Sequence, residues 1–205
     1  MSDGDEPAPS LRHVIAEDLR SFAELKRGRL SSLVGVLDVL LFPGVLAVLI
    51  FRLAGAFHRA RLRPISRLLY IADLVLFSVD LAPGAKVGPG LALPHPVGVA
   101  IAPDARIGRW VRIFQGVSVG GVSFEDPERD GFPTVGDRCW IFSGAKVLGP
   151  IDIGDDAMIA SNALVIRSVP PGGVVVGNPA RVVRYRSGYG PSGAAPSAAD
   201  GAGSV

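Results

Sequence analysis

Aliphatic residues recur every six positions from Leu81 to Val165, with polar residues or glycine between them. The register shifts by two residues after Val99 and is interrupted between Val119 and Val135. The residues that open the six-residue units are Leu81, Val87, Leu93, Val99, Ile101, Ile107, Ile113, Val119, Val135, Ile141, Val147, Ile153, Ile159 and Val165. A second small or apolar position follows four places after most openers, at Ala85, Leu91, Val97, Ala105, Val111, Val117, Cys139, Ala145, Ile151, Ala157, Ala163 and Val169. A repeat of fixed short period predicts a solenoid.

This period predicts a triangular prism, in which each unit supplies one short strand and one corner. The opener points inward, the second position lies inward near the corner, and the glycines that often follow the opener suit tight turns. Three units close a coil of eighteen residues, so the fourteen openers predict between four and five coils. Stacked coils bury a continuous aliphatic column and share backbone hydrogen bonds. We therefore predict a mainly β protein with a parallel β-helix over residues 80–186.

The segment before the repeats has helical spacing instead. Apolar residues recur at three and four places over residues 46–53 and 68–76, which is the period of an amphipathic helix. Pro43 and Pro64 stand where helices can begin, because the missing N–H of proline costs nothing at the first helical position. Residues 18–26 predict a more polar helix. We expect residues 11–79 to form a helical cap or an oligomerisation domain, preceded by a polar arm at residues 1–10.

Two segments cannot continue the repeat. Residues 122–133 (VSFEDPERDGFP) carry acids, an arginine, glycine and two prolines, and they predict a loop extruded from one corner. Loops on rigid scaffolds commonly carry function. The segment 187–205 is mostly Gly, Ala, Ser and Pro, a composition that predicts a disordered tail.

Composition narrows the class of protein. The 205 residues are 48% hydrophobic and 20% charged, which predicts one folded domain with short appendages. The formal net charge of +2, without a basic stripe, argues against a nucleic-acid binder. Cys139 is the single cysteine, so no intrachain disulfide forms and a reducing cytoplasm fits. The longest uncharged run, residues 39–51, is shorter than the roughly 20 residues that span a bilayer. The apolar stripe over residues 46–53 leaves peripheral contact with the inner face of the membrane open.

His95 has the strongest claim to chemistry. Prolines flank it on both sides and fix the local backbone, and it stands third in its unit, where a side chain points away from the prism. Asp80 lies fifteen residues earlier, one coil below and near the same corner. A carboxylate there could fix the tautomer of the imidazole and raise its basicity. The alternative for Asp80 is a cap where the helices meet the solenoid. His13 and His58 fall in the helical region, and we expect both at the surface.

Several segments of this chain resemble the serine acetyltransferases, hexapeptide-repeat enzymes that acetylate a hydroxyl group. The resemblance is good over residues 80–184 and looser over residues 19–79. The matching motifs are Asp80–Ala85 (DLAPGA), Pro94–Gly98 (PHPVG), Phe114–Gly121 (FQGVSVGG), Gly144–Gly149 (GAKVLG), Val169–Gly172 (VPPG) and Gly177–Arg181 (GNPAR). The resemblance implies a left-handed parallel β-helix and an acetyl-CoA-dependent O-acetyltransferase. It also implies that His95 is the general base and Asp80 its orienting partner.

Under the acetyltransferase hypothesis, we expect the other motif residues to bind the oxyanion or CoA. Backbone amides at Gly120 and Gly121 are candidates to bind the oxyanion of the tetrahedral intermediate. We expect CoA along the groove between neighbouring coils, where the contacting residues are Gly144, Ala145, Ala160 and Ser161, with Lys146 or Arg181 near phosphate. We expect no metal and no acyl-enzyme, because Cys139 occupies an inward corner position typical of a small core residue.

Two positions depart from the family pattern. The family has an aspartate before the catalytic histidine, where this chain has Pro94, and its loop ends Arg-His-Pro, where this chain has Gly131, Phe132 and Pro133. In the family those polar groups hold the amino acid. We therefore expect a neutral hydroxyl compound such as a sugar or another alcohol as the acceptor, contacting Pro94, Gln115 and Phe132. Serine O-acetyl transfer, as in cysteine biosynthesis, is the alternative.

Other classes of function remain for comparison. A non-catalytic solenoid scaffold is the further alternative, and release of coenzyme A in the presence of several alcohols distinguishes it from an enzyme. A metal enzyme resembling the γ-carbonic anhydrases would need several histidines converging on one site, whereas the solenoid contains His95 alone. The resemblance implies a homotrimer, with CoA between neighbouring prisms; a hexamer stays open because the helical region is shorter than is usual in the family. We expect no nucleic-acid partner and a cytoplasmic location.

Overall fold

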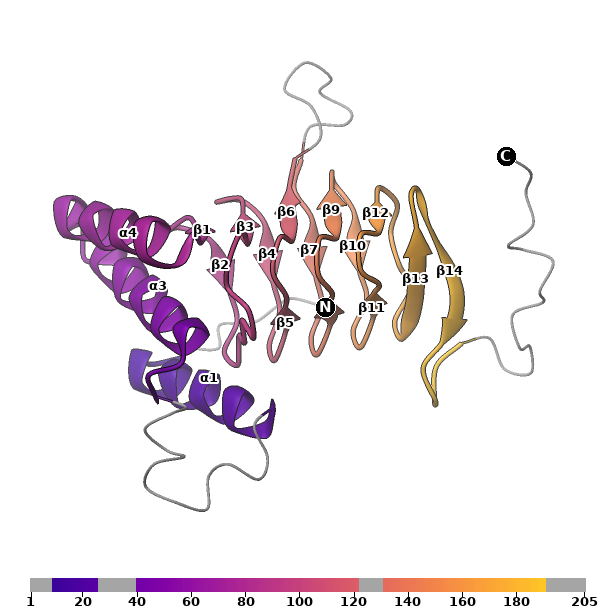
Figure 1. The fold of residues 1–205 in the computed structure, drawn as a ribbon, viewed down its shortest axis with the longest axis horizontal. Helices are drawn as coiled ribbons and strands as arrows, with labels where there is room; N and C mark the ends of the chain where they lie inside the picture. The colour runs from indigo at the N-terminus through magenta and orange to yellow at the C-terminus, as the bar shows by residue number, and fades with distance from the viewer. Residues whose placement is uncertain (1–8, 26–39, 122–130, 191–205) are drawn as a thin grey trace, which may run out of the picture.

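The computed structural model describes residues 9–25, 40–121 and 131–190. Most of the predicted polar arm, most of the predicted extruded loop and most of the predicted tail lie outside these described residues. The described part consists of helices at one end of a long stack of short strands (Figure 1).

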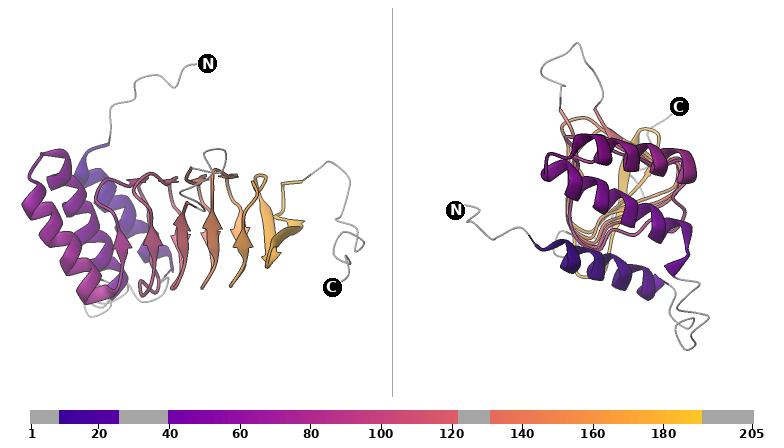
Figure 2. Two further views of the ribbon diagram at one scale, coloured as in Figure 1. Left: turned by 90° about the horizontal axis from the view of Figure 1, so that it is seen from above. Right: turned by 90° about the vertical axis from the view of Figure 1, so that its left-hand side faces the viewer.

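The helices are α1 (Leu11–Leu25), α3 (Pro43–Arg59) and α4 (Arg63–Phe77). Pro43 is the first residue of α3, and Pro64 is the second residue of α4, as the N-terminal preference of proline predicts. α1 begins at Leu11, earlier than the polar helix expected over residues 18–26. α3 and α4 lie across the end of the strand stack (Figure 2, right). None of the described helices is long and apolar enough to cross a membrane.

The strands form the three faces of a parallel β-helix. The first face contains β1 (Asp80–Leu81), β3 (Ala100–Ile101), β6 (Ser118–Gly120), β9 (Lys146–Leu148) and β12 (Leu164–Val165) in that order. The second contains β2 (Lys86–Val87), β4 (Arg106–Ile107), β7 (Thr134–Val135) and β10 (Asp152–Ile153). The third contains β5 (Arg112–Ile113), β8 (Trp140–Ile141), β11 (Met158–Ile159), β13 (Gly173–Gly177) and β14 (Ala180–Tyr185). All pairs are parallel except β13 with β14, which closes the stack as an antiparallel hairpin.

The coils differ in length where the sequence pattern shifts. Ala100 pairs with Ser118, a spacing of eighteen residues, whereas Asp80 pairs with Ala100, a spacing of twenty. The first coil is therefore two residues longer, and Leu93 and Ile101, the inward positions on either side of one of its corners, lie eight residues apart instead of six. The two-residue shift in the repeat thus marks a widened corner, and that corner contains His95.

The inward positions form one continuous core. The openers are buried except Val87, which is partly buried. Among the second positions, the prediction that Val97 points inward is wrong, because its side chain is 61% exposed. In the widened corner the additional residues turn Val97 outward and Val99 takes the buried place. Cys139 is buried as predicted, and burial raises the pKa of its thiol to about 12, so the thiolate nucleophile is not available near neutral pH.

A buried ion pair joins the helices to the first coil. Arg52 of α3 donates to both carboxylate oxygens of Asp18 of α1, at 2.9 and 3.1 Å. The same guanidinium donates to the carbonyl oxygens of Val87 and Gly88. Asp18 also accepts from the backbone amides of residues 90 and 91, at 2.8 and 2.9 Å. Because each charge has several partners, the ion pair fixes α1 and α3 on the solenoid.

Candidate active site

His95 lies in the corner that leads from the third face to the first, which we call the histidine corner (residues 94–98, 114–117, 142–145 and 160–163). At this corner a backbone amide of each coil donates to a carbonyl oxygen of the segment that precedes it in the stack. Gly98 N donates to Ser78 O at 2.8 Å, and Gly116 N donates to Val97 O at 2.9 Å. Gly98 and Gly116 have φ of +72° and +70°, a region that favours glycine. The corner is therefore a regular backbone ladder, with His95 at its first step.

The side chain of His95 is exposed at an apolar cavity. The cavity has a volume of about 460 Å³, and its lining residues are Phe42, Pro43, Leu76, Phe77, Ser78, Pro94, His95, Pro96 and Val97. No lining residue other than His95 carries an ionisable side chain. The end of α4 and the start of α3 thus supply one wall and the widened corner supplies the other. An imidazole at such a cavity can accept a proton from a hydroxyl group that enters it.

Asp80 makes a different contact from the one that spacing suggested. Its Oδ1 accepts a hydrogen bond from the Tyr70 hydroxyl of α4 at 2.7 Å, which raises the pKa of Tyr70. Asp80 pairs with Ala100 across the sheet, so it lies five residues beyond the place next to His95. Among the described residues, no hydrogen bond or ion pair links Asp80 to His95. The expectation of an eighteen-residue first coil had placed them closer.

The histidine corner brings together most of the residues expected to contact CoA or the acceptor. Pro94 lines the cavity, and Gln115 is exposed one coil above His95. Gly144 N donates to Gln115 O at 2.8 Å, which continues the ladder by another step. Ala160 and Ser161 form the last step. The side chain of Ala145 is fully buried in the core, so only its backbone faces the corner.

The two basic residues expected near phosphate have local partners. Lys146 Nζ donates to Gly116 O at 2.5 Å and to Ser118 Oγ at 3.1 Å. These bonds hold the ammonium against the neighbouring coil. Arg181 lies on β14 at the far end of the stack, where it is exposed and donates to Ala180 O at 3.0 Å. Arg181 therefore has the more accessible charge of the two.

Gly120, Gly121 and Phe132 lie at the other edge of the first face. Gly120 ends β6 of the first face, and Phe132 precedes β7 of the second face. A Cβ on Gly121 would lie 3.6 Å from the ring of Phe132, so these two residues are neighbours. His95 precedes the first face and this group follows it. Within one chain, the structure therefore places the proposed base and the proposed oxyanion donors on opposite edges of the same sheet.

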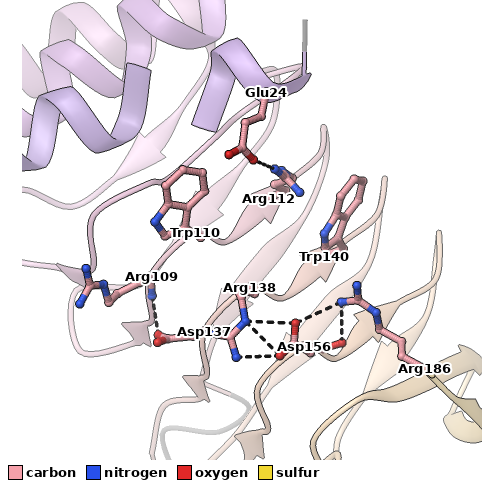
Figure 3. Close-up of a pocket in the computed structure, with 9 residues that line it drawn as sticks. All are labelled: Glu24, Arg109, Trp110, Arg112, Asp137, Arg138, Trp140, Asp156 and Arg186. Atoms are coloured by element: carbon pink, nitrogen blue, oxygen red, sulfur yellow. Dashed lines mark hydrogen bonds and ion pairs between the residues drawn. The ribbon is translucent and has the colours of Figure 1, made fainter. Parts of the chain in front are cut away.

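A larger hollow of about 580 Å³ lies at the corner between the second and third faces (Figure 3). Its polar groups pair with one another: Arg138 contacts Asp156 at 2.7 Å and Arg112 contacts Glu24 at 3.1 Å. The Arg112 guanidinium also lies 4.6 Å from the ring centroid of Trp140. The Arg112–Glu24 pair joins α1 to the solenoid, and the Arg138–Asp156 pair joins neighbouring coils, so we interpret the hollow as a structural junction.

Sequence reasoning missed the helical residues that line the His95 cavity. Phe42, Leu76 and Phe77 belong to the helical region, for which the sequence predicts a cap or an oligomerisation domain. One feature of the sequence could have identified Leu76 and Phe77: they stand four and three places before Asp80, where the chain enters the first coil. Among the residues that the structure describes, no group of three or more His, Cys, Asp or Glu side chains is arranged to hold a metal ion.

Comparison with known proteins agrees with this architecture. Residues 132–167 match the family model described as bacterial transferase hexapeptide (six repeats). A serine acetyltransferase of Helicobacter pylori is 40% identical over 145 residues, which are 71% of this chain and 84% of that protein. A serine acetyltransferase of Mycobacterium tuberculosis is 43% identical over 142 residues, which are 69% of this chain and 61% of that protein. The structure of soybean serine acetyltransferase complexed with serine superimposes with a TM-score of 0.75 at 35% identity, covering 85% of this chain and 70% of the soybean chain.

The fold and these similarities define a hexapeptide-repeat acyltransferase on a left-handed parallel β-helix, preceded by helices. The predicted fold class is thereby confirmed. The chain belongs to the serine acetyltransferase family.

Proposed function

We propose that this protein transfers the acetyl group of acetyl-CoA to the hydroxyl of L-serine, with His95 as the general base. The observation that carries the proposal is the placement of His95: two prolines hold it at the mouth of a cavity on the fold of serine acetyltransferases. The relatives named above favour serine over the sugar or other alcohol that the loop residues predicted.

The proposed reaction needs one base and no acyl-enzyme. His95 accepts the hydroxyl proton while the oxygen attacks the thioester carbon. Backbone amides stabilise the oxyanion of the tetrahedral intermediate. The intermediate collapses by breaking the carbon–sulfur bond, and the imidazolium returns its proton to the departing thiolate. The products are the acetylated acceptor and coenzyme A, and the hydroxyl proton ends on the thiol of coenzyme A.

The two edges of the first face suggest how one site is completed. His95 lies at one edge, whereas Gly120 and Gly121 lie at the other. In a closed homotrimer, the histidine corner of one copy would meet the opposite edge of its neighbour. We propose that CoA lies in that seam, along Gly144, Ala160 and Ser161, with Arg181 as the exposed cation for phosphate.

Asp80 is proposed as a positioning residue that acts through Tyr70 or, after a side-chain rotation, on His95 directly. Asp80→Asn keeps the shape and removes the charge, so turnover should fall by roughly ten- to a hundredfold, less than loss of the base itself. Tyr70→Phe is the matched variant, because it removes only the hydroxyl that Asp80 binds. If both variants keep native turnover and an unaltered pH profile, Asp80 is a structural cap.

The cavity supports a second candidate acceptor, a neutral hydroxyl compound. Its lining residues offer no ion pair for the ammonium or carboxylate of an amino acid. A buried charge that lacks a partner costs roughly 1–3 kcal/mol or more. Apolar walls such as Phe42 and Phe77 instead suit the carbon face of a neutral molecule.

One assay distinguishes the candidates: coenzyme A release from acetyl-CoA with L-serine, D-serine, and a panel of sugars and simple alcohols. A much higher kcat/KM for L-serine than for every other acceptor supports the proposed function. A higher value for a neutral acceptor supports the second candidate. If no acceptor accelerates release, while His95→Ala and the native chain behave alike, the chain is a scaffold.

A further inference from the structure

The helix α4 buries two polar residues and exposes several apolar ones. It buries its polar residues Ser66 and Asp73, each only 2% exposed. Leu68 and Val75, by contrast, are 67% and 73% exposed. The exposed apolar residues, which we call the α4 outer face, are Leu62, Ile65, Leu68, Ile71, Leu74, Val75 and Leu76. A contiguous exposed apolar surface of this kind marks an interaction site.

Arginines border this face. Arg59, Arg61, Arg63 and Arg67 are all exposed, at the end of α3 and along the first turns of α4. None of the four forms an ion pair with a residue that the structure describes. Between residues 40 and 79 the sequence contains a single acidic residue, Asp73, and it is buried. The surface formed by α4 and the end of α3 is therefore apolar and cationic, and the exposed carboxylate of Asp80 next to it is already engaged by the Tyr70 hydroxyl.

We propose that the α4 outer face docks on the surface of an anionic membrane, with the arginines against the lipid headgroups. A helix that presents an apolar face and basic residues lies in the membrane interface, where both parts find partners. A second copy of the same face is a poorer occupant, because it offers apolar contact but no carboxylate for the arginines. The position of α4 at the end of the stack leaves the solenoid clear of the membrane (Figure 1).

The docking surface differs from the one that the sequence suggested. Of the predicted stripe on α3, Leu46, Leu49 and Ile50 are only partly exposed and Leu53 is 40% exposed, because α3 lies between α4 and the rest of the protein. Most of the apolar surface available for contact is therefore on α4, where Leu68, Val75 and Leu76 are each about two thirds exposed or more. Leu76 belongs both to the α4 outer face and to the His95 cavity. Docking would thus place the cavity near the membrane, whatever the acceptor is.

Vesicle flotation tests the proposal with the full chain. The protein should float with vesicles of phosphatidylcholine containing about a third phosphatidylglycerol, and remain below vesicles of phosphatidylcholine alone. Raising the salt from about 0.1 M to about 1 M should weaken flotation, because it shortens the range of the electrostatic attraction. Absence of flotation with the anionic vesicles at the lower salt would overturn the proposal.

Paired variants separate the apolar and the charged contributions. Leu68→Glu with Val75→Glu should reduce partition by at least about tenfold, whereas Val176→Glu with Val183→Glu, exposed at the other end of the stack, should not. Arg63→Gln with Arg67→Gln should weaken partition by about fivefold for each arginine. Arg106→Gln with Arg167→Gln removes the same net charge from the solenoid and should leave partition unchanged. Equal flotation of all variants would show that the α4 outer face does not dock on the membrane. If the native chain does not bind vesicles and Leu68→Glu with Val75→Glu lowers the oligomer mass, the face is instead a contact between copies of this chain.

Discussion

At the scale of single residues, exposure and local partners decide which side chains are available for chemistry. His95 is exposed at an apolar cavity and has prolines on both sides. Asp80 is also exposed, but its carboxylate is occupied by the Tyr70 hydroxyl. Asp73 is buried, and its Oδ1 has no hydrogen-bond partner among the described residues. Of these side chains, His95 is the one placed to act as the proposed base, and the buried Asp73 lowers the stability of the fold.

His95→Ala should abolish most acetyl transfer while the fold and CoA binding persist. Removing a general base typically lowers kcat by about 10²- to 10⁴-fold. Steady-state kinetics, with a binding measurement for CoA, would check this. His58→Ala is the matched control, since His58 is an exposed histidine of α3, and it should retain native turnover. Comparable rates for both variants would remove His95 from the mechanism.

Asp73→Asn should stabilise the protein at alkaline pH. Burial raises the pKa of Asp73 from 3.8 to about 7. Between these values the folded chain binds more protons than the unfolded chain, so stability falls as pH rises through this window and levels off above it. The asparagine carries no charge, and it should therefore add up to about 4 kcal/mol at pH 8 and little at pH 4. Urea unfolding at the two pH values measures the difference; equal pH dependence in both proteins would contradict it.

At the scale of elements, the helices and the solenoid depend on each other. α1 and α3 meet the first coil through Asp18 and Arg52, and α4 continues directly into β1. The cavity at His95 exists only because the ends of α3 and α4 cover the first corner. The helical region therefore shapes the candidate site as well as capping the prism.

Arg52→Met should weaken this junction strongly. It leaves the Asp18 carboxylate buried with two backbone donors but no countercharge. Breaking a buried ion pair from one side typically costs about 3–5 kcal/mol. Arg20→Met is the control, because Arg20 is a surface arginine of α1 that pairs with Glu17, and it should cost about 1 kcal/mol or less. Denaturant unfolding compares them, and equal losses would mean that the buried pair adds nothing specific.

At the scale of the whole molecule, one chain does not assemble the proposed site. The histidine corner and the edge that contains Gly121 flank the first face on opposite sides. A catalytic site built from both therefore needs a second copy, as proposed above. This arrangement can be tested by mixing two inactive chains.

His95→Ala and Gly121→Trp should each be inactive alone and partly active when coexpressed. A Cβ at Gly121 would meet its neighbours at ordinary distances of 3.5 Å or more, so a side chain can begin there without strain, and we expect the indole of tryptophan to block the edge. In randomly mixed trimers, about a quarter of the sites would combine an intact histidine with an intact edge. Turnover near that fraction supports a shared site. No recovery in assemblies shown to be mixed would place the whole site within one chain.

The sequence by itself determined the solenoid. A buried aliphatic position every six residues has few structural solutions, and the inward places it assigned are nearly all buried. It also singled out His95, because flanking prolines and an outward position are local properties. The widened corner was visible as a two-residue shift, although its consequence for Val97 was not.

Only the tertiary structure decided what surrounds those residues. One wall of the His95 cavity comes from Phe42, Leu76 and Phe77, which belong to the helical region that the sequence predicts as a cap or an oligomerisation domain. The partner of Asp80 is Tyr70 rather than His95, because two additional residues in the first coil displace the register. The exposure of apolar residues on α4 likewise depends on which side of the helix meets α3. A periodic pattern fixes the direction of a side chain relative to its own backbone, whereas its neighbours depend on how separate elements pack.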